Sequence, residues 1–292
     1  MWRRGHEHKD LQGGLPGIVN GIREFDDLPL SPLALDLLAS RGRRLAQPMA
    51  AERIRDRARL QPDGAPATVI VPEVVEHMAD FEQQFGGLWY SILKERENGM
   101  EYGLQGDCTL FRTRFGPAFR AIMDGALTEP LHILPDGRTL IGLGLSTPDR
   151  VIDSSVIQRI EGHALLAVAG RWAHHRYPFE TAYGADPAVN TEAFPPAVPR
   201  ATGPTKRWWL DGDRAVLLRL RSWWTRVRGT GIMTAGPDRW TMWCFSRTEA
   251  GLAWASGRQA DIGGIPVADS GWCVVCARST PGSLNCKPIG SQ

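Results

Sequence analysis

The stretch Phe81-Glu-Gln-Gln-Phe85-Gly86-Gly87-Leu88-Trp89-Tyr90 decides how this chain folds. Apolar residues recur up to Phe85 at intervals of four, three and four, which predicts the buried stripe of an amphipathic helix. Pro72 suits the first turn of that helix, where its missing N–H would have no partner. The stripe consists of Val74, Met78, Phe81 and Phe85.

The double glycine predicts where this helix ends, because Gly86 or Gly87 can adopt the left-handed backbone conformation at low cost. Apolar and other residues then alternate from Leu88, so a strand is expected to start at once, with Trp89 buried. Asn98-Gly99 is a strong turn signal, and we expect residues 100–104 to return as the second arm of a hairpin.

The rest of the first half of the sequence predicts helices followed by a sheet, without a βαβ alternation. Ser31-Pro32 is typical of a helix start, and Asp153 or Ser154 is expected to cap a closing helix along Ile157, Ile160, Ala164 and Val168. The other expected elements are a helix at 48–60, a strand at 108–111, a short helix at 117–123 and a hairpin from 131–134 and 139–143. This order predicts an α+β fold, with N-terminal helices packed on a mainly antiparallel sheet.

Composition divides the chain into four segments. We expect a flexible arm at 1–27, an α+β domain at 28–183 and a proline-rich linker at 184–206. The last segment, 207–292, is rich in tryptophan and arginine, and is expected to be either a β-rich module or poorly ordered. Short strands are predicted there at 215–220 and 241–245.

The overall totals are those of an ordinary globular protein: 292 residues, 42% hydrophobic, 23% charged and a net charge of +2. No apolar run is long enough for a membrane helix, and the first residues lack the apolar core of a secretory signal. We therefore expect a cytoplasmic protein that does not bind membranes.

Four of the five cysteines lie late in the chain, at Cys244, Cys273, Cys276 and Cys286. Cys273-Val-Val-Cys276 has the spacing of a zinc ribbon. Two intervening valines favour an extended strand, however, which would point the two sulfurs to opposite faces. We therefore expect buried thiols, with no bound metal and no cofactor.

Four stretches together resemble the SUKH superfamily, and within it the third SUKH subfamily of bacterial immunity proteins. They are Leu30-Ser-Pro-Leu-Ala-Leu-Asp-Leu-Leu38, Phe81–Tyr90, Ile133-Leu-Pro-Asp-Gly-Arg-Thr-Leu140 and Val151-Ile-Asp-Ser-Ser155, within about residues 28–170. The opening helix departs from the family because Arg41-Gly42-Arg43 stands where a Gly-Trp is common. The resemblance implies an α+β fold without catalysis that binds and neutralises a protein toxin of nuclease or deaminase type.

Charge is distributed unevenly in a way that suits such a binding role. Residues 61–110 carry nine acids against Lys94 and Arg96, a local balance of −7. An acidic surface would speed association with a cationic toxin. The residues that we expect to contact the partner are Glu95, Glu97, Glu101 and Asp107, and the expected structural motif is Phe81, Phe85, Gly86, Gly87 and Trp89.

Two other functions remain open. The basic tail interleaves arginine with tryptophan at Lys206-Arg-Trp-Trp209 and Arg219-Leu-Arg-Ser-Trp-Trp224, a pattern that could bind nucleic acid. Alternatively, histidines could form an acid–base site with nearby carboxylates. That enzymatic hypothesis concerns His163, His174 and His175 with Asp153 or Glu161.

Overall fold

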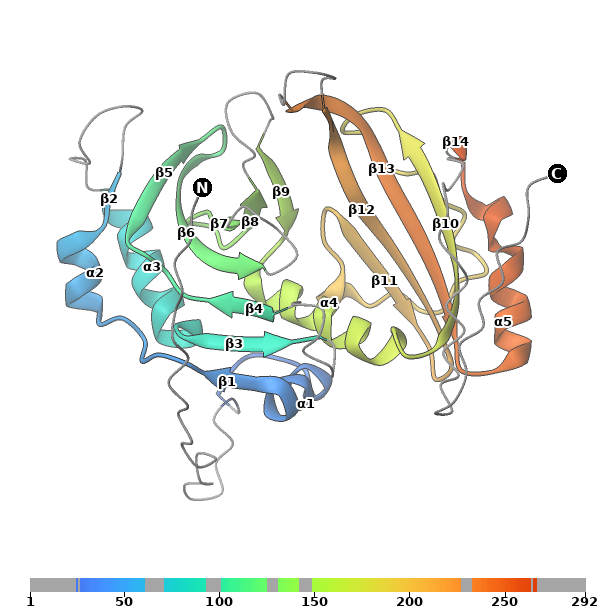
Figure 1. Ribbon diagram of the computed structural model, residues 1–292, viewed down its shortest axis with the longest axis horizontal. Coiled ribbons are helices and arrows are strands. Elements are labelled where there is room, and N and C mark those ends of the chain that lie inside the picture. The colour runs from blue at the N-terminus through green and yellow to red at the C-terminus, as the bar shows by residue number, and fades with distance from the viewer. Residues whose placement is uncertain are drawn as a thin grey trace, which may run out of the picture.

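Two β-sheets and five α-helices make up the part of the chain that this computed structural model describes (Figure 1). The described residues are 25, 27–60, 71–92, 101–124, 131–141, 149–226, 233–263 and 265–266. The α-helices are α1 (Pro32–Arg41), α2 (Ala51–Arg57), α3 (Pro72–Phe85), α4 (Val156–Ala169) and α5 (Glu249–Ser256), joined by the short 3-10 helices Pro199–Ala201 and Gly257–Asp261.

The first sheet has nine strands, and all of them come from the region expected to form the α+β domain. Its strands are β1 (Gly42–Arg44), β2 (Arg59–Leu60), β3 (Leu88–Ser91), β4 (Glu101–Leu104), β5 (Thr109–Thr113), β6 (Gly116–Asp124), β7 (Leu131–Ile133), β8 (Thr139–Ile141) and β9 (Arg150–Asp153). The main order is β1-β3-β4-β6-β7-β8-β9, with β5 on β6 and β2 on β5. Every pair is antiparallel except β2–β5, so the predicted fold class is confirmed.

The second sheet has five strands and is built mainly from the tryptophan-rich tail. Its order is β11-β12-β13-β10-β14, from β10 (Ala173–Thr181), β11 (Lys206–Leu210), β12 (Arg214–Arg226), β13 (Met233–Ser246) and β14 (Ile265–Pro266). The described part of the tail is therefore β-rich. The predicted strand 215–220 lies in the first half of the longer β12, and the predicted strand 241–245 lies at the end of the longer β13. β10 belongs to this sheet although it precedes residue 183, so the second sheet begins before the expected domain boundary.

The deciding stretch folds as its pattern predicts. α3 runs from Pro72 to Phe85 with its apolar stripe buried, and Gly87 follows in the left-handed region at φ +75°. β3 then starts at Leu88 and pairs antiparallel with β4, the expected second arm. α3 packs on the sheet through Phe81, whose ring meets the Phe119 ring edge-on at 5.6 Å.

Trp89 is half-buried, which differs from the expected burial. Its neighbours Leu88 and Tyr90 are buried on one face of β3, and alternation places Trp89 on the other face. There its indole lies over Gly103, the residue opposite on β4, where no side chain stands between them.

The prediction of a short helix at residues 117–123 is wrong, because these residues belong to the long strand β6. β6 pairs with β4, β5 and β7, so its backbone satisfies the hydrogen bonding of three neighbours. A helix here would leave all three without that partner, and tertiary pairing therefore outweighs local preference. The turn into the strand uses Gly116 at φ +111°.

Side chains cap the two helices that flank the first sheet. Ser31 caps α1 as predicted, accepting a hydrogen bond from the Ala34 amide at 3.3 Å. At α4 the cap is Ser155, whose Oγ accepts from the Gln158 amide at 3.0 Å, and not Asp153 or Ser154. Asp153 is instead completely buried.

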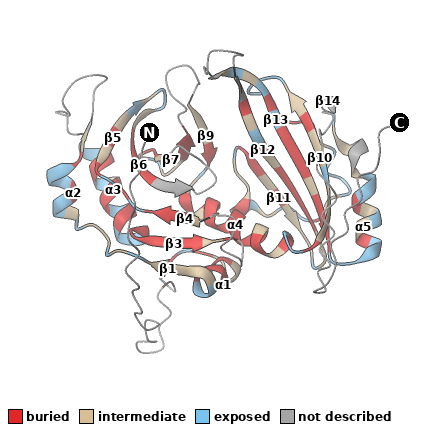
Figure 2. Cartoon of the chain, in the orientation of Figure 1, coloured by how far each residue is buried: buried red, intermediate tan, exposed pale blue. Residues whose placement is uncertain are grey.

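α4 lies between the two sheets and packs against both (Figure 1). Ile160 and Ala164 join the main core, whereas Leu165 and Ala169 pack with Leu217 in a second cluster on the five-stranded sheet. α5 covers the opposite face of that sheet, where the Tyr177 hydroxyl donates to the Ala255 carbonyl at 2.7 Å. Buried residues continue through α4 into the facing strands of both sheets (Figure 2).

Candidate functional site

Of the acidic residues predicted to bind a partner, the two that the structure describes lie at or beyond opposite ends of one strand. Glu95 and Glu97 lie outside the described residues. Glu101 is the first residue of β4 and accepts from Arg43 at 2.9 Å, whereas Asp107 follows the far end of that strand and accepts from Arg120 at 2.7 Å. Both carboxylates are about one third exposed and already paired.

The histidines of the enzymatic hypothesis do not converge either. His163 is buried in α4, where its Nδ1 forms a 2.9 Å hydrogen bond with the Tyr90 hydroxyl and its ring lies 4.3 Å from that of Tyr102. Burial, and then the charges of nearby cations, holds its pKa well below the usual value. His174 and His175 stand on β10, and neighbouring strand residues point to opposite faces.

A buried ionic cluster is centred on Asp153. Lys206 Nζ lies 2.6 Å from one carboxylate oxygen, and Arg159 donates to the other at 2.9 Å. The Thr139 hydroxyl donates to that second oxygen at 2.7 Å. We call these four residues the Asp153 cluster. They come from β8, β9, α4 and β11, so the cluster joins the two sheets through α4.

Burial and charge act in opposite directions within this cluster. Burial alone would raise the pKa of Asp153, but the charges of Lys206 and Arg159 and the hydrogen bonds outweigh it and hold that pKa well below its usual range. Burial lowers the pKa of Lys206 to about 8, although Asp153 opposes the shift. At neutral pH Asp153 is therefore ionised and Lys206 is largely protonated, and the two charged groups are paired with each other.

Glu161, the second carboxylate of the enzymatic hypothesis, is also engaged in holding the fold. It accepts from the Ser31 amide at 2.7 Å and lies 3.4 Å from Arg200, which ties α1 and the 3-10 helix at Pro199 to α4. A bidentate pair between Arg150 and Asp238, at 2.6 and 2.7 Å, links β9 to β13. These contacts make the junction between the two sheets a network of fixed ion pairs.

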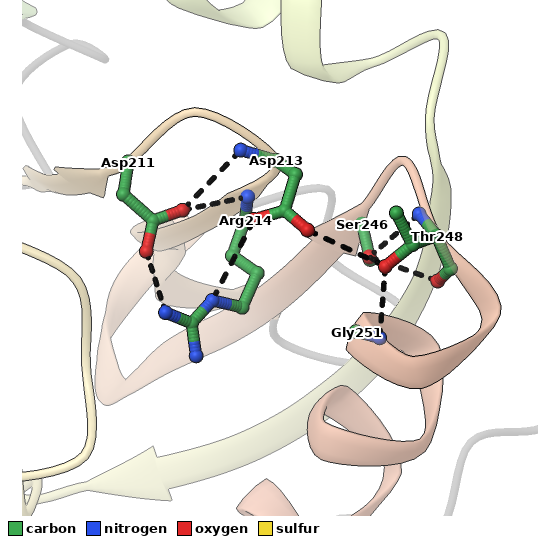
Figure 3. A network of polar contacts seen from close by, with 6 residues as sticks. All are labelled: Asp211, Asp213, Arg214, Ser246, Thr248 and Gly251. Carbon is green, nitrogen blue, oxygen red and sulfur yellow. Dashed lines mark hydrogen bonds and ion pairs between the residues drawn. The ribbon is translucent and has the colours of Figure 1, made fainter.

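Figure 3 shows a second polar network, where the β11–β12 turn meets the start of α5. Asp211 accepts from the Arg214 amide at 2.9 Å and from its guanidinium at 2.7 Å. Thr248 caps α5 by accepting from the Gly251 amide at 3.1 Å, and its hydroxyl donates to Asp213 at 3.4 Å. Each group serves a turn or a helix end, so this network positions backbone and holds no reactive constellation.

Among the tryptophans expected to stack on nucleic acid bases, those whose burial the structure describes are buried or half-buried. Trp208 and Trp223 are buried. Trp209 is half-buried and meets the Phe194 ring edge-on at 5.2 Å. Arg207 pairs with Asp186 at 2.8 Å. These residues of the predicted motif stabilise the second sheet.

A different basic surface lies on the second sheet, on the face that α4 partly covers. Strand register aligns Trp243 with Arg176 on β10 and with Leu217 on β12, and Arg219 follows two residues later on the same face. The guanidinium of Arg221 stands over the Trp243 ring at 5.7 Å. We call Arg176, Arg219, Arg221 and Trp243 the arginine face. Sequence reasoning found Arg219 and Arg221 but missed the other two, because only the pairing of β10 with β13 brings them together.

A small pocket separates α3 from the start of α4. Its volume is about 150 Å³, enough for a few water molecules, and its lining includes His77, Asp80, Phe85 and Ser155. Burial lowers the pKa of His77, with Asp80 opposing the shift. The pocket has no buried charged group directed into it that would select a ligand.

Within the described ranges, no three or more His, Cys, Asp or Glu side chains are grouped as metal ligands would be. Cys244 is buried in β13, whereas Cys273, Cys276 and Cys286 lie outside those ranges. The described helices include none with the length and apolar character needed to cross a bilayer.

Comparison of the chain with protein-family models, with curated proteins and with solved structures gives no match. The SUKH resemblance of the first half therefore stays an expectation drawn from its motifs.

Proposed function

We propose that this chain is a non-catalytic binding protein that neutralises a protein toxin, as immunity proteins of the SUKH superfamily do. The observation that carries the proposal is the architecture of the first half. Helices α1 and α3 accompany a mainly antiparallel sheet, most of whose strands follow α3, and α4 comes after its last strand. This α+β layout is the one that the resemblance implies.

The buried ionisable groups support binding over the enzymatic alternative. Asp153 is neutralised by Lys206 and Arg159, and Glu161 holds Ser31. A catalytic acid or base must reach a substrate proton, directly or through one water, and these groups are instead committed to internal partners. His163 bonds Tyr90 in the same interior.

Glu101 and Asp107, each about one third exposed, are the proposed contacts for a cationic toxin. Exposed ion pairs such as Glu101–Arg43 and Asp107–Arg120 contribute little to stability, so a partner's cations can compete for those carboxylates at low cost. Charges of this kind at the rim of an interface act mainly on the association rate.

Co-expression tests the proposal. The gene next to this one should encode a secreted protein with a toxic C-terminal domain, and this chain should restore growth to cells that make that domain. In kinetic binding measurements, Glu101→Gln combined with Asp107→Asn should slow association, and the difference should shrink as salt screens the field.

The matched control is Glu52→Gln, which removes an exposed acid on α2 away from β4 and should leave the association rate unchanged. A toxic neighbour that this chain neither binds nor neutralises would refute the proposal. An unchanged rate in the Glu101/Asp107 variant, with binding intact, would refute the assigned surface alone.

A further inference from the structure

The face of the second sheet that α4 covers divides into an apolar end and a basic end. At the apolar end, Leu217 and Phe245 pack against Leu165 of α4. Towards the other end, the same face carries Arg219, which is half-buried, and Arg221, which is exposed. The face therefore changes from core to charged surface along two neighbouring strands.

The arginines of this basic end lie close enough to repel one another. Partial desolvation is the main cause that lowers the pKa of Arg221, and the positive charges of Arg219 and Arg176 lower it further. Among the described residues, neither Arg219 nor Arg221 forms an ion pair with a carboxylate. Arg239 on β13 and Glu180 on β10 form an ion pair with each other at 2.9 Å.

Arg219 and Arg221 differ in this respect from other cations near the junction of the two sheets. Lys206 lies directly opposite Arg219 in the strand register, but it forms an ion pair with Asp153. Arg150 is likewise matched by Asp238. Like charges that lie close together repel one another, so an anionic ligand beside Arg219 and Arg221 would relieve this repulsion as well as gain contacts.

We propose that the arginine face, formed by Arg176, Arg219, Arg221 and Trp243, binds the backbone and bases of a single-stranded nucleic acid. This inference is independent of the toxin-binding function, because it uses the opposite charge and the other sheet.

The geometry favours a nucleic acid over an acidic polypeptide. Residues two apart on a strand are about 6.6 Å apart, and β10 and β12 are separated by one intervening strand, so the charges spread in two directions across the sheet. A chain of regularly spaced phosphates can meet several of them at once. The Arg221 guanidinium and the Trp243 ring beneath it are planar groups on which bases can stack. The carboxylates of an acidic polypeptide cannot stack on them in this way.

Fluorescence anisotropy with the full chain and a labelled single-stranded RNA of mixed sequence tests this inference. Binding should weaken steeply with salt, by about 0.7 in log K per unit of log salt for each phosphate contact. Arg219→Gln and Arg221→Gln should each weaken binding about five- to tenfold at low salt and reduce that slope by about one contact.

Two further variants make the result specific. Trp243→Phe keeps an aromatic ring in a half-buried position and should retain much of the affinity, whereas Trp243→Leu should lose more if bases stack there. Arg55→Gln removes the same charge from α2, where Arg55 pairs with Glu76, and should bind RNA as the unchanged chain does. Circular dichroism of each variant establishes that it is folded.

Three outcomes overturn the inference. The first is absence of RNA binding by the full chain at low salt. The second is binding that Arg219→Gln and Arg221→Gln leave unchanged. The third is competition by polyglutamate as effective as that by unlabelled RNA, which would assign the arginine face to an acidic protein instead.

Discussion

Replacing Lys206 by methionine should destabilise the fold strongly, because it removes one of the two cations that neutralise the buried Asp153. The side chains of Asp153 and Arg159 are 0% and 4% exposed, so water cannot substitute for the lost ammonium group. Removing one member of a buried ion pair typically costs about 3–5 kcal/mol. Asp153→Asn should cost a similar amount, since it leaves Lys206 and Arg159 as buried cations without their shared anion.

The double variant Asp153→Asn, Lys206→Met is the informative one. It removes an anion and a cation together, so its loss of unfolding free energy should fall short of the sum of the single losses by about 1–3 kcal/mol. Urea unfolding followed by tryptophan fluorescence and circular dichroism measures each member of this cycle. Arg55→Gln, which opens an exposed pair, should leave the unfolding midpoint unchanged. Strict additivity of the two single losses would refute the idea that these residues act as a unit.

The pH dependence of stability follows from the same cluster. Because the pKa of Asp153 is lower in the folded chain than the roughly 3.9 of an unfolded aspartate, its carboxylate contributes its full stability above about pH 4. That contribution is lost as the pH falls towards the folded pKa. The unfolding free energy of the unchanged chain should therefore fall more steeply on acidification than that of Asp153→Asn. If urea titrations at a series of acidic pH values show the same fall for both proteins, Asp153 is not the group responsible.

Three further outcomes are expected from single sites. Gly87→Ala should lower the unfolding free energy by at least about 1–2 kcal/mol in urea titrations, because φ is +75° and the new methyl group would meet the Ala46 carbonyl. Glu82→Gln should cost about 1–3 kcal/mol in the same assay, since one of the amides of Met49 and Gly106 loses its acceptor. Burial raises the pKa of Cys244 to about 12, so iodoacetamide at pH 8 should leave that thiol unmodified until urea unfolds the chain, as peptide mass mapping would show.

Local signals predicted the elements that local chemistry determines. The helix from Pro72 to Phe85 has its own start, stripe and stop, so its bounds follow from neighbouring residues alone. The hairpin of β7 and β8 is similar, since Gly137 at φ +84° makes its turn. Such elements need no information from distant parts of the chain.

Elements determined by distant partners could not be predicted in this way. Residues 117–123 have a short helical pattern, but β6 exists because three other strands pair with it. β12 and β13 extend well beyond the predicted segments because they pair over almost their whole length, through two irregularities in register. Cooperative pairing of this kind is not visible in a short window of sequence.

The candidate sites show the same division. The Asp153 cluster joins Thr139, Asp153, Arg159 and Lys206. The sequence pointed to Asp153 only as a helix cap or a catalytic carboxylate, and to Lys206 only as part of a nucleic-acid-binding pattern. Arg159 lies six residues along the chain, but Lys206 lies 53 residues away and arrives only because β11 docks beside α4. The arginine face likewise depends on the pairing of β10 with β13.

The position of α4 explains why the predicted domain boundary does not separate two independent units. One side of the helix contributes Ile160 and Ala164 to the main core, and Leu165 and Ala169 pack on the second sheet. Cutting the chain at residue 183 would uncover these last two side chains and leave β10 without β13, an unpaired edge with exposed backbone groups. It would also remove Lys206 and leave Arg159 as the remaining cation of the Asp153 cluster. The acidic surface and the arginine face must therefore be tested by point substitutions in the whole chain, because the fragment that carries one of them lacks the contacts that fold it.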